Sequence, residues 1–445
     1  TQFGRGGVRM DAMTLAEVTV STTFIVFAYL AIGAAALVIF VGLFGPGLRY
    51  KISVTNAEDN SSESFVHTLE ALTDSKVHHD LELRVLTNGP EFYEEELRTI
   101  AAAKCSVNLE AYIFQRGAIA QRYVDALTER ARAGVKVNVV LDALGSASTT
   151  TRYFKKFKDA GGNLAWYNDA SWNKLPRYNH RTHRELLVVD GRIAFIGGAG
   201  VADHWYRGHK GKPRWRDTMV RVEGGAVANL QATFAENWLE SSGEVLTGPD
   251  YFPTPEECPS SGEALVINST PSAGGSTRAR MLFQLLLASA KKSIHVTTPY
   301  FLPDRSMIDE LVRAVRDRGV EVRLLVPGKR SDHLLTRSSS RHAYGKLLKA
   351  GAEIFEYQPA MIHAKILLID GAWGVIGSTN FDNRSFGLND EVNLAVRYSP
   401  FVERLETDFV NDLAASERVT YEQWRRRPVL ERAPELLGWV LERQQ

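Results

Sequence analysis

Two stretches decide the fold of this chain: His183-Arg184-Glu185-Leu186-Leu187-Val188-Val189-Asp190-Gly191 and His363-Ala364-Lys365-Ile366-Leu367-Leu368-Ile369-Asp370-Gly371. Each places an aspartate seven residues after a histidine and then continues to a small-residue turn, Ile196-Gly197-Gly198 or Ile376-Gly377-Ser378. The copies are 180 residues apart throughout. Such an internal repeat predicts two similar structural units. Because each copy carries half of a set of reactive groups, we expect the two copies to meet in one site.

The residues between each histidine and its aspartate predict a short buried strand. Positions 186–189 and 366–369 are all branched and apolar, a composition that favours strands. Alternate side chains of a strand share a face. We therefore expect His363 and Lys365 to point into one pocket, and His183 and Glu185 to do the same.

A repeating α/β pattern surrounds both motifs. Strand, helix and strand are expected at 106–114, 119–133 and 135–141, and again at 293–301, 306–318 and 320–326. Gly134 and Gly319 follow the two helices as C-caps. Strands that alternate with helices predict mixed sheets with helices on their faces.

The second copy resembles the signature of the phospholipase D superfamily, H-x-K-x4-D followed by G-S-x-N, and its context resembles the bacterial cardiolipin synthase-like branch. It matches that signature through His363, Lys365, Asp370, Gly377, Ser378 and Asn380. The resemblance covers residues 85–428. The first copy departs from the signature at Glu185, where lysine is expected, and at Gly200, which corresponds to Asn380.

This resemblance implies an α/β fold of two phospholipase D-like lobes. Each lobe would be a mixed β-sheet flanked by helices, and pseudo-twofold symmetry would relate the lobes around one shared active site. We place the first lobe at 85–255 and the second at 256–445. The division falls in 248–262, which is rich in proline, glycine and serine.

The N-terminal region predicts a membrane anchor. After a tail at 1–17, residues 18–48 contain no charged side chain, and a spanning helix needs about 20 apolar residues. A cleaved signal peptide is the alternative, but the apolar run is too long for one. Arginines precede the segment and basic residues follow it, so its orientation is undetermined. Residues 49–84 are expected to form a linker region.

The resemblance also implies phosphoryl transfer through a phosphohistidine. One histidine attacks phosphorus and holds it covalently, while the other protonates the leaving alkoxide. We assign His183 as the nucleophile and His363 as the general acid/base. This scheme requires neither a metal nor a cofactor.

Four carboxylates are candidate catalytic residues. Asp217 and Glu391 each open an apolar strand and are expected to orient the histidines. Asp190 and Asp370 belong to the motifs themselves. Each could partner a histidine, or simply form a turn with the glycine that follows it.

Phosphate binding is expected from Lys365 and from the small-residue turns with Gly198, Ser378 and Asn380. Two basic loops add candidates. Residues 204–216 include Arg214 and mix cations with tryptophans, and residues 329–342 include Arg341. Cations beside aromatic rings suit a lipid headgroup interface. The formal net charge of +1 gives no global attraction to nucleic acid.

Glu185 leaves three hypotheses open, because a carboxylate near a phosphate is repulsive unless it is protonated or paired. The first half-site has lost phosphate binding, a neighbouring cation substitutes for the missing lysine, or Glu185 has a role of its own. We list it with the substrate-binding candidates.

The sequence therefore predicts a membrane-anchored phosphatidyltransferase that makes cardiolipin from phosphatidylglycerol at the bacterial cell membrane. Its partners would be a phospholipid substrate and the bilayer. Two alternatives stay open: a phospholipase D-type phosphodiesterase or nuclease, and a catalytically silent phospholipid-binding protein. The acceptor and the oligomeric state are not determined by the sequence.

Overall fold

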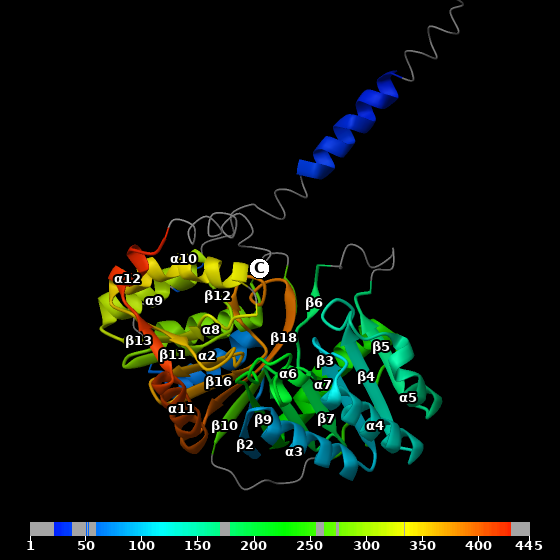
Figure 1. Ribbon diagram of the computed structural model, residues 1–445. Coiled ribbons are helices and arrows are strands. Elements are labelled where there is room, and N and C mark those ends of the chain that lie inside the picture. The colour runs from blue at the N-terminus through cyan, green and yellow to red at the C-terminus, as the bar shows by residue number, and fades with distance from the viewer. Residues whose placement is uncertain are drawn as a thin grey trace, which may run out of the picture. The chain divides into compact units, whose positions relative to one another are not determined.

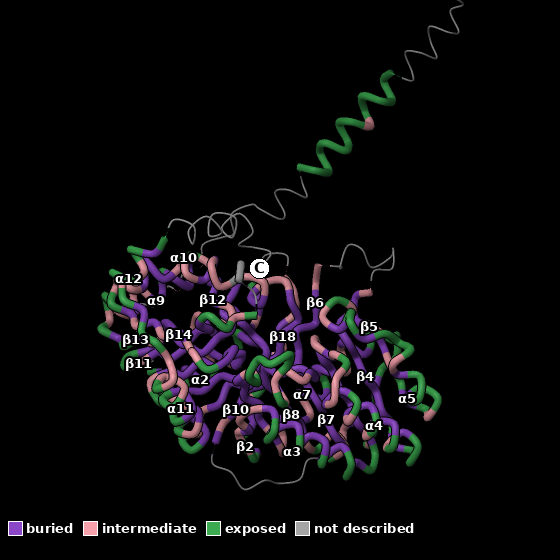
Figure 2. Tube along the Cα trace, viewed as in Figure 1, coloured by how far each residue is buried: buried purple, intermediate pink, exposed green. Residues whose placement is uncertain are grey.

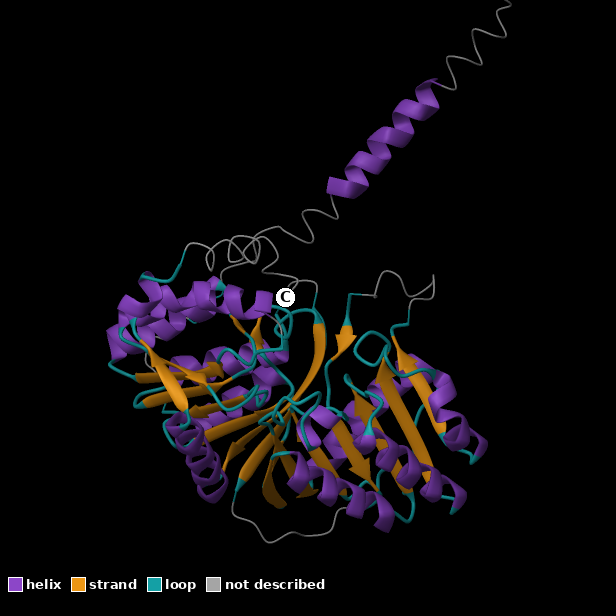
Figure 3. Cartoon of the chain, in the orientation of Figure 1, coloured by secondary structure: helices purple, strands orange, loops and turns teal. Residues whose placement is uncertain are grey.

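The computed structural model describes residues 22–37, 50, 52, 59–169, 179–254, 262–272, 276–332 and 334–428. A helix at 22–37 belongs to one compact unit, and both lobes belong to another. Within the second unit, two sheets with their helices lie beside each other (Figure 1, Figure 3).

The first lobe is built on a seven-stranded sheet. Its strand order is β2 (Leu81–Thr87), β9 (Thr218–Gly224), β8 (Ile193–Gly197), β7 (Leu186–Val189), β3 (Ser106–Ala111), β4 (Lys136–Asp142) and β5 (Asn163–Tyr167). Strands β3, β4 and β5 run parallel, and the other pairs are antiparallel. The sheet is therefore mixed, as predicted.

Helices cover both faces of this sheet. One face packs against α3 (Gly89–Ala102), α4 (Ala118–Arg132) and the short pair η1 (Thr151–Phe154) and α5 (Lys155–Asp159). The other face packs against α7 (Ala226–Ser242). A short helix, α6 (Asp203–Tyr206), lies in the loop before β9. Burial follows these layers, with the strands buried and the outer helix faces exposed (Figure 2).

The second lobe contains a ten-stranded sheet. The order is β1 (Val77–His78), β10 (Glu263–Ser269), β18 (Asn389–Arg397), β16 (Trp373–Gly377), β15 (Ile366–Ile369), β11 (Ser293–Thr297), β13 (Glu321–Pro327), β14 (Glu353–Tyr357) and β19 (Ser416–Val419). The tenth strand, β6 (Arg181–Thr182), comes from the first lobe's sequence and pairs with β18. A separate small pair joins β12 (Phe301–Leu302) to β17 (Phe381–Asp382).

Helices again cover both faces of the second sheet. Three of them contribute to one core: α8 (Arg278–Ser289), α9 (Arg305–Arg318) and α10 (Leu334–Ala350). Helix α11 (Ser399–Ala414) covers the opposite face, and α12 (Tyr421–Arg425) follows β19. Helix α9 begins after Asp304, whose side chain accepts the Met307 N–H at 3.0 Å. It ends at the left-handed Gly319, which confirms that predicted C-cap.

The two lobes share a hydrophobic core. One buried cluster includes Val188, Ile196 and Phe234 from the first lobe together with Leu368, Ile376 and Leu405 from the second. Contiguous apolar burial of this kind favours a fixed arrangement over independently moving domains. The shared core therefore fixes the relative positions of residues that the two lobes contribute to a site at their interface.

The predicted transmembrane anchor at 18–48 is wrong. In the part of the chain that the structure describes, no helix has both the length and the apolar character that a membrane crossing needs. The described part of the N-terminal helix, residues 22–37, is shorter than the roughly 20 residues required. Residues 18–21 and 38–48 of the prediction lie outside the described residues.

Part of the segment expected as a linker, 49–84, is built into the lobes. Helix α2 (Glu63–Thr73) packs its buried face, with Phe65 and Leu69, into the core of the second lobe. The Ser62 side chain caps this helix by accepting the Phe65 N–H at 3.1 Å. Strand β1 then joins the second sheet and β2 joins the first. The chain therefore ties the two lobes together before the first motif begins.

Candidate active site

The two motif histidines lie at the lobe interface, just before strands β7 and β15. His183 and His363 are buried, with 9% and 5% of their surfaces exposed. Each is fixed by a backbone hydrogen bond to the opposite lobe. The His183 N–H donates to the Asp390 carbonyl at 2.9 Å, and the His363 N–H donates to the Arg216 carbonyl at 2.7 Å.

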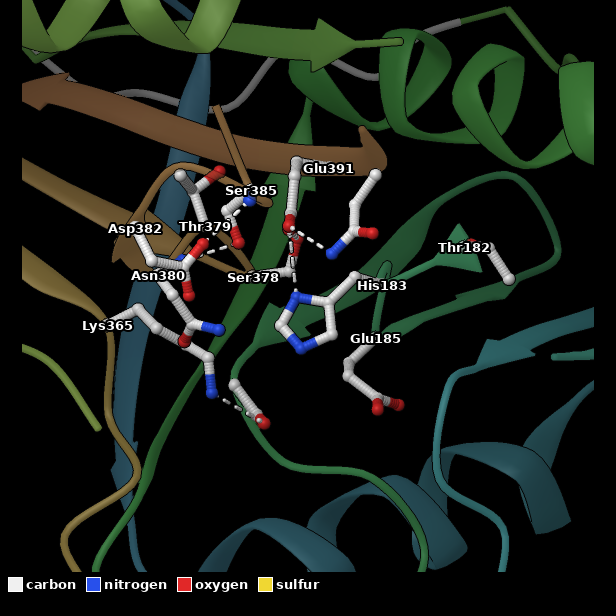
Figure 4. Close-up of polar contacts among 12 residues, drawn as sticks. Thr182, His183, Glu185, Lys365, Ser378, Thr379, Asn380, Asp382, Ser385 and Glu391 are labelled. Atoms are coloured by element: carbon white, nitrogen blue, oxygen red, sulfur yellow. Dashed lines mark hydrogen bonds and ion pairs between the residues drawn. The ribbon is translucent and has the colours of Figure 1, made fainter. Parts of the chain in front are cut away.

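These backbone bridges place each histidine beside a carboxylate of the other lobe. Glu391 of the second lobe lies with both carboxylate oxygens 3.1 Å from Nδ1 of His183 (Figure 4). Asp217 of the first lobe lies with Oδ2 2.9 Å from Nδ1 of His363. We call this arrangement the crossed histidine–carboxylate pairs. It brings together four of the residues that the sequence predicts.

The two carboxylates occupy equivalent positions in the repeat. Asp217 lies two residues before Met219, which pairs with Gly197, and Glu391 lies two residues before Asn393, which pairs with Gly377. Their supporting donors differ. The Ser378 hydroxyl donates to Glu391 at 2.5 Å, whereas the Trp205 indole N–H donates to Asp217 at 2.9 Å.

Both carboxylates are held ionised. Burial raises the pKa of Asp217, but its hydrogen bond with His363 and the charge of Lys365 together hold that pKa below the usual value. Burial likewise opposes ionisation of Glu391, and the neighbouring His183 and the Ser378 hydroxyl outweigh it and lower the pKa. A carboxylate at Nδ1 fixes the ring so that Nε2 faces the reaction.

His363 and Lys365 are strongly coupled. Burial, followed by the charge of Lys365, lowers the pKa of His363 to about 4, against the opposing effect of Asp217. Burial also lowers the pKa of Lys365 to about 8, although neighbouring carboxylates oppose the shift. The Lys365 ammonium lies 2.8 Å from Nδ1 of His363 and 2.9 Å from the His363 carbonyl. In this state the motif lysine therefore rests against the histidine ring.

Two more signature residues of the second copy, Ser378 and Asn380, belong to the same pocket. Asn380 is buried beside Lys365 (Figure 4), and its side-chain oxygen has no hydrogen-bond partner among the described residues. A bound group with a hydrogen-bond donor would supply the partner that this buried oxygen lacks. Among the described residues, no group of three histidine, cysteine, aspartate or glutamate side chains is arranged to hold a metal ion.

Packing requires glycine at position 198, where the second copy has Ser378. A β-carbon at this position would lie 2.8 Å from Oδ1 of Asp217 and 3.0 Å from Cδ of Lys365. The Gly198 carbonyl lies 3.5 Å from the Lys365 ammonium. Its counterpart Ser378 has room for a hydroxyl. The first copy therefore cannot supply the donor that the second copy gives to Glu391.

Glu185 takes a position of its own. Its carboxyl is buried and directed away from Lys365 (Figure 4), and Oε1 accepts the Ile113 backbone N–H at 3.3 Å. Burial raises its pKa well above the usual value, although that backbone bond lowers it. A β-carbon at Gly200 would lie 2.9 Å from the same Oε1. The two departures of the first copy are therefore linked, because glycine at 200 leaves the space that Glu185 fills.

Asp190 and Asp370 lie outside this pocket. Seven residues of extended chain separate each from its histidine, roughly 23 Å. Both adopt left-handed backbone conformations in the turns after β7 and β15. Oδ1 of Asp190 accepts the Cys105 N–H at 2.7 Å, and Oδ1 of Asp370 accepts the Lys292 N–H at 2.7 Å. The geometry assigns them to turn formation, the structural option that the sequence left open.

The basic-loop candidates have different surroundings from the buried histidines. Arg214 is exposed, and Arg341 faces Glu356, with 3.4 Å between Nε and Oε1. By contrast, Trp205 from the first basic loop is fully buried, with its ring centroid 5.3 Å from that of His363. Trp205 is a site residue that the sequence did not identify, because nothing in the loop's composition separates a buried indole from one facing lipid.

Comparison with known proteins places the chain in a family. The family described as "Cardiolipin synthase, PLD-like domain" matches residues 97–238 and 284–413. Cardiolipin synthase 1 of Bacillus cereus is 35% identical over 358 residues, which cover 78% of this chain and 70% of that protein. Cardiolipin synthase of Geobacillus kaustophilus is 34% identical over 367 residues, covering 80% of this chain and 71% of its own.

Solved structures share the fold at low sequence identity. Phosphatidylserine synthase of Haemophilus influenzae superposes with a TM-score of 0.62 at 13% identity, covering 85% of this chain and all of that one. Polyphosphate kinase of Porphyromonas gingivalis gives a TM-score of 0.52 at 13% identity, over 81% of this chain and 53% of that one. With the family match and the sequence relatives, the conclusion is that this chain belongs to the cardiolipin synthase family of phospholipase D-like proteins.

Proposed function

We propose that this protein makes cardiolipin by transferring a phosphatidyl group from one phosphatidylglycerol to the glycerol hydroxyl of another. Its family makes it a phosphatidyltransferase of the phospholipase D type. The observation that carries the proposal is the crossed histidine–carboxylate pairs, which set two buried imidazoles at one interface, each oriented at Nδ1.

In the first step, Nε2 of His183 attacks phosphorus and the bond from phosphorus to the glycerol oxygen breaks. His363 gives its proton to that oxygen, so glycerol leaves and the phosphatidyl group stays on His183. Glu391 accepts the Nδ1–H of His183 and stabilises the positive charge that develops on the ring. Two in-line displacements then replace one difficult displacement.

His363 must gain a proton before it can act as the acid. Its pKa of about 4 leaves it neutral at pH 7 in the free protein. A bound phosphodiester brings negative charge, and Lys365 is close enough to turn from the ring toward the phosphate. Both changes raise the pKa of His363. Substrate binding and protonation of the acid are therefore expected to be coupled.

In the second step, His363 takes a proton from the glycerol hydroxyl of a second phosphatidylglycerol. The alkoxide oxygen attacks phosphorus, the bond to His183 breaks, and cardiolipin is released. Lys365 supplies the motif cation for the non-bridging oxygens in both steps. Because both substrates are bilayer lipids, we place the reaction at a membrane surface.

The test is an assay of the full chain with phosphatidylglycerol vesicles, with and without EDTA. Cardiolipin and glycerol are expected in equal amounts under both conditions. His183→Ala and His363→Ala should each form none. Phosphatidate without cardiolipin would instead assign hydrolysis, and vesicle binding without any turnover would assign a silent lipid-binding protein.

A further inference from the structure

A second, strongly basic pocket lies on the second lobe and is lined by residues of α10, α12 and β19. Helices α10 and α12 lie side by side (Figure 1). Its cations come from separate segments: Lys329, Arg337, Arg341, Arg418, Arg426 and Arg427. Two carboxylates, Glu356 and Glu417, also line it. The positive charges therefore exceed the negative ones within a single hollow.

A buried carboxylate, Glu356, lies between two arginines of this pocket. Glu356 is buried, with 6% of its surface exposed. Arg337 lies 3.0 Å from one of its carboxylate oxygens and Arg341 lies 3.4 Å from the other. The described lining of the pocket holds more cations than carboxylates, and this cluster is its most buried part. Such a position favours a further anion.

The rim carries cations with no carboxylate of their own. Lys329 and Arg426 are exposed, and neither forms an ion pair among the described residues. Arg418, in contrast, pairs with Glu353 at 2.8 Å. Like charges gathered in this way repel one another, so a bound anion would relieve the repulsion.

The scaffold of the pocket is firmly built. Trp424 donates its indole N–H to the Arg341 carbonyl at 2.6 Å, which fastens α12 to α10. Arg427 stacks over that indole at 4.2 Å and donates to the Trp424 carbonyl at 2.7 Å. A β-carbon at Gly345 would lie 2.3 Å from the same indole, so glycine there permits the contact. The cations are therefore positioned by packing.

We propose that this pocket binds the phosphate group of a second ligand, separately from the crossed histidine–carboxylate pairs. Guanidinium groups match phosphate oxygens in geometry and remain charged at any physiological pH. Asp332, which precedes α10 in the sequence, accepts the Tyr300 hydroxyl at 2.6 Å. The Tyr300 ring lies 6.3 Å from that of His363. The residues that line the pocket include none of the four crossed-pair residues, so a phosphate bound here would not occupy the catalytic position.

Two sources share this chemistry, an anionic lipid headgroup and soluble phosphate, and the experiment separates them. The full chain and the double variant Lys329→Glu/Arg426→Glu are tested in two arms. One arm measures sedimentation with phosphatidylglycerol or phosphatidylcholine vesicles, and the other measures calorimetric binding of inorganic phosphate. The matched control is Lys156→Glu/Lys158→Glu, which makes the same charge change at exposed positions of the first lobe.

The double variant is expected to lose at least about tenfold in affinity for phosphatidylglycerol vesicles, since each basic residue near an anionic surface contributes substantially. The control should lose much less. Loss in the vesicle arm alone assigns a lipid headgroup, and loss in the phosphate arm alone assigns soluble phosphate. Unchanged binding in both arms, or an equal loss in the control, overturns the proposal.

The proposed turnover is tested independently of this pocket. His363→Ala should bind phosphatidylglycerol vesicles as the unmodified chain does, because the pocket does not include the histidines. If His363→Ala lost vesicle binding to the same extent as the double variant, the pocket would not be a separate site. If the unmodified chain proved inactive, the binding comparison would still stand.

Discussion

The two copies of the motif agree in how they orient a histidine and differ in how they treat a phosphate. Each histidine receives a buried carboxylate from the opposite lobe, at equivalent positions of the repeat. The second copy adds Lys365 and Asn380, whereas the first has Glu185 and Gly200 in their places. The two histidine rings are thus oriented symmetrically, whereas only the second copy supplies a motif lysine.

That difference shows which part of the site needs two copies. A displacement through a covalent intermediate requires two oriented rings, one on each side of phosphorus. Charge stabilisation can come from one side, provided that it is held in place. Glu185 is then free to accept the Ile113 backbone N–H in the segment that follows β3.

The largest expected effects test the carboxylates that orient the two histidines. Asp217→Asn and Glu391→Gln should each lower kcat by on the order of 10³–10⁴, because an amide cannot hold the ring in the required tautomer or stabilise its charge. Initial rates with phosphatidylglycerol vesicles would measure this.

The control is a pair of circular dichroism melts, which should show that both variants remain folded. A large loss in one variant with near-normal rates in the other would break the comparison, since it would mean that only one ring needs its carboxylate.

The next prediction tests the position at which the copies differ, Lys365 in the second and Glu185 in the first. Lys365→Met should lower kcat by on the order of 10²–10³, because it removes a preorganised charge from the phosphate. Glu185→Gln, at the equivalent position, should change the rate less than about fivefold, because its carboxyl points away from Lys365. Comparable losses in both variants would mean that Glu185 contacts the substrate.

A smaller effect concerns the supporting donors. Ser378→Ala removes the hydroxyl that donates to Glu391. A hydrogen bond to a charged group contributes about 1.5–3 kcal/mol, so a rate loss of roughly 10- to 100-fold is expected. Trp205→Phe removes the corresponding donor to Asp217 and is the matched variant. No loss in either would show that the carboxylates are fixed by the backbone alone.

The smallest effect is one of stability. Because burial raises the folded-state pKa of Glu185, the folded protein retains a proton that the unfolded chain releases. The protonated Glu185 carboxyl contributes fully to the free energy of unfolding below its unfolded-state pKa near 4.5. This contribution is lost as pH rises above that value. Glu185→Gln should therefore gain relative stability between pH 5 and pH 8, measured as the shift in urea midpoint. An equal midpoint difference at both pH values would contradict the prediction.

Much of the site could be predicted from the repeat. The pattern identified both histidines and Lys365, and the apolar strands that follow identified Asp217 and Glu391. The crossing could not be predicted, because it depends on backbone hydrogen bonds between residues far apart in the sequence, His183 with Asp390 and His363 with Arg216. The seven-residue spacing singled out Asp190 and Asp370, but an extended chain carries them away from the histidines. The role of Glu185 depended on the space at Gly200, which no local pattern reveals.

The crossed pairs have a consequence for the history of the chain. A protein made of one such lobe would carry a histidine without its partner carboxylate, and a carboxylate without its partner histidine. Two identical lobes meeting about a twofold axis would complete both pairs at once. Gene duplication and fusion would then keep the carboxylate of each lobe beside the histidine of the other. Each half could diverge at positions that do not take part in these pairs. Positions 185 and 200 lie outside the exchanged pairs, and there the two copies differ.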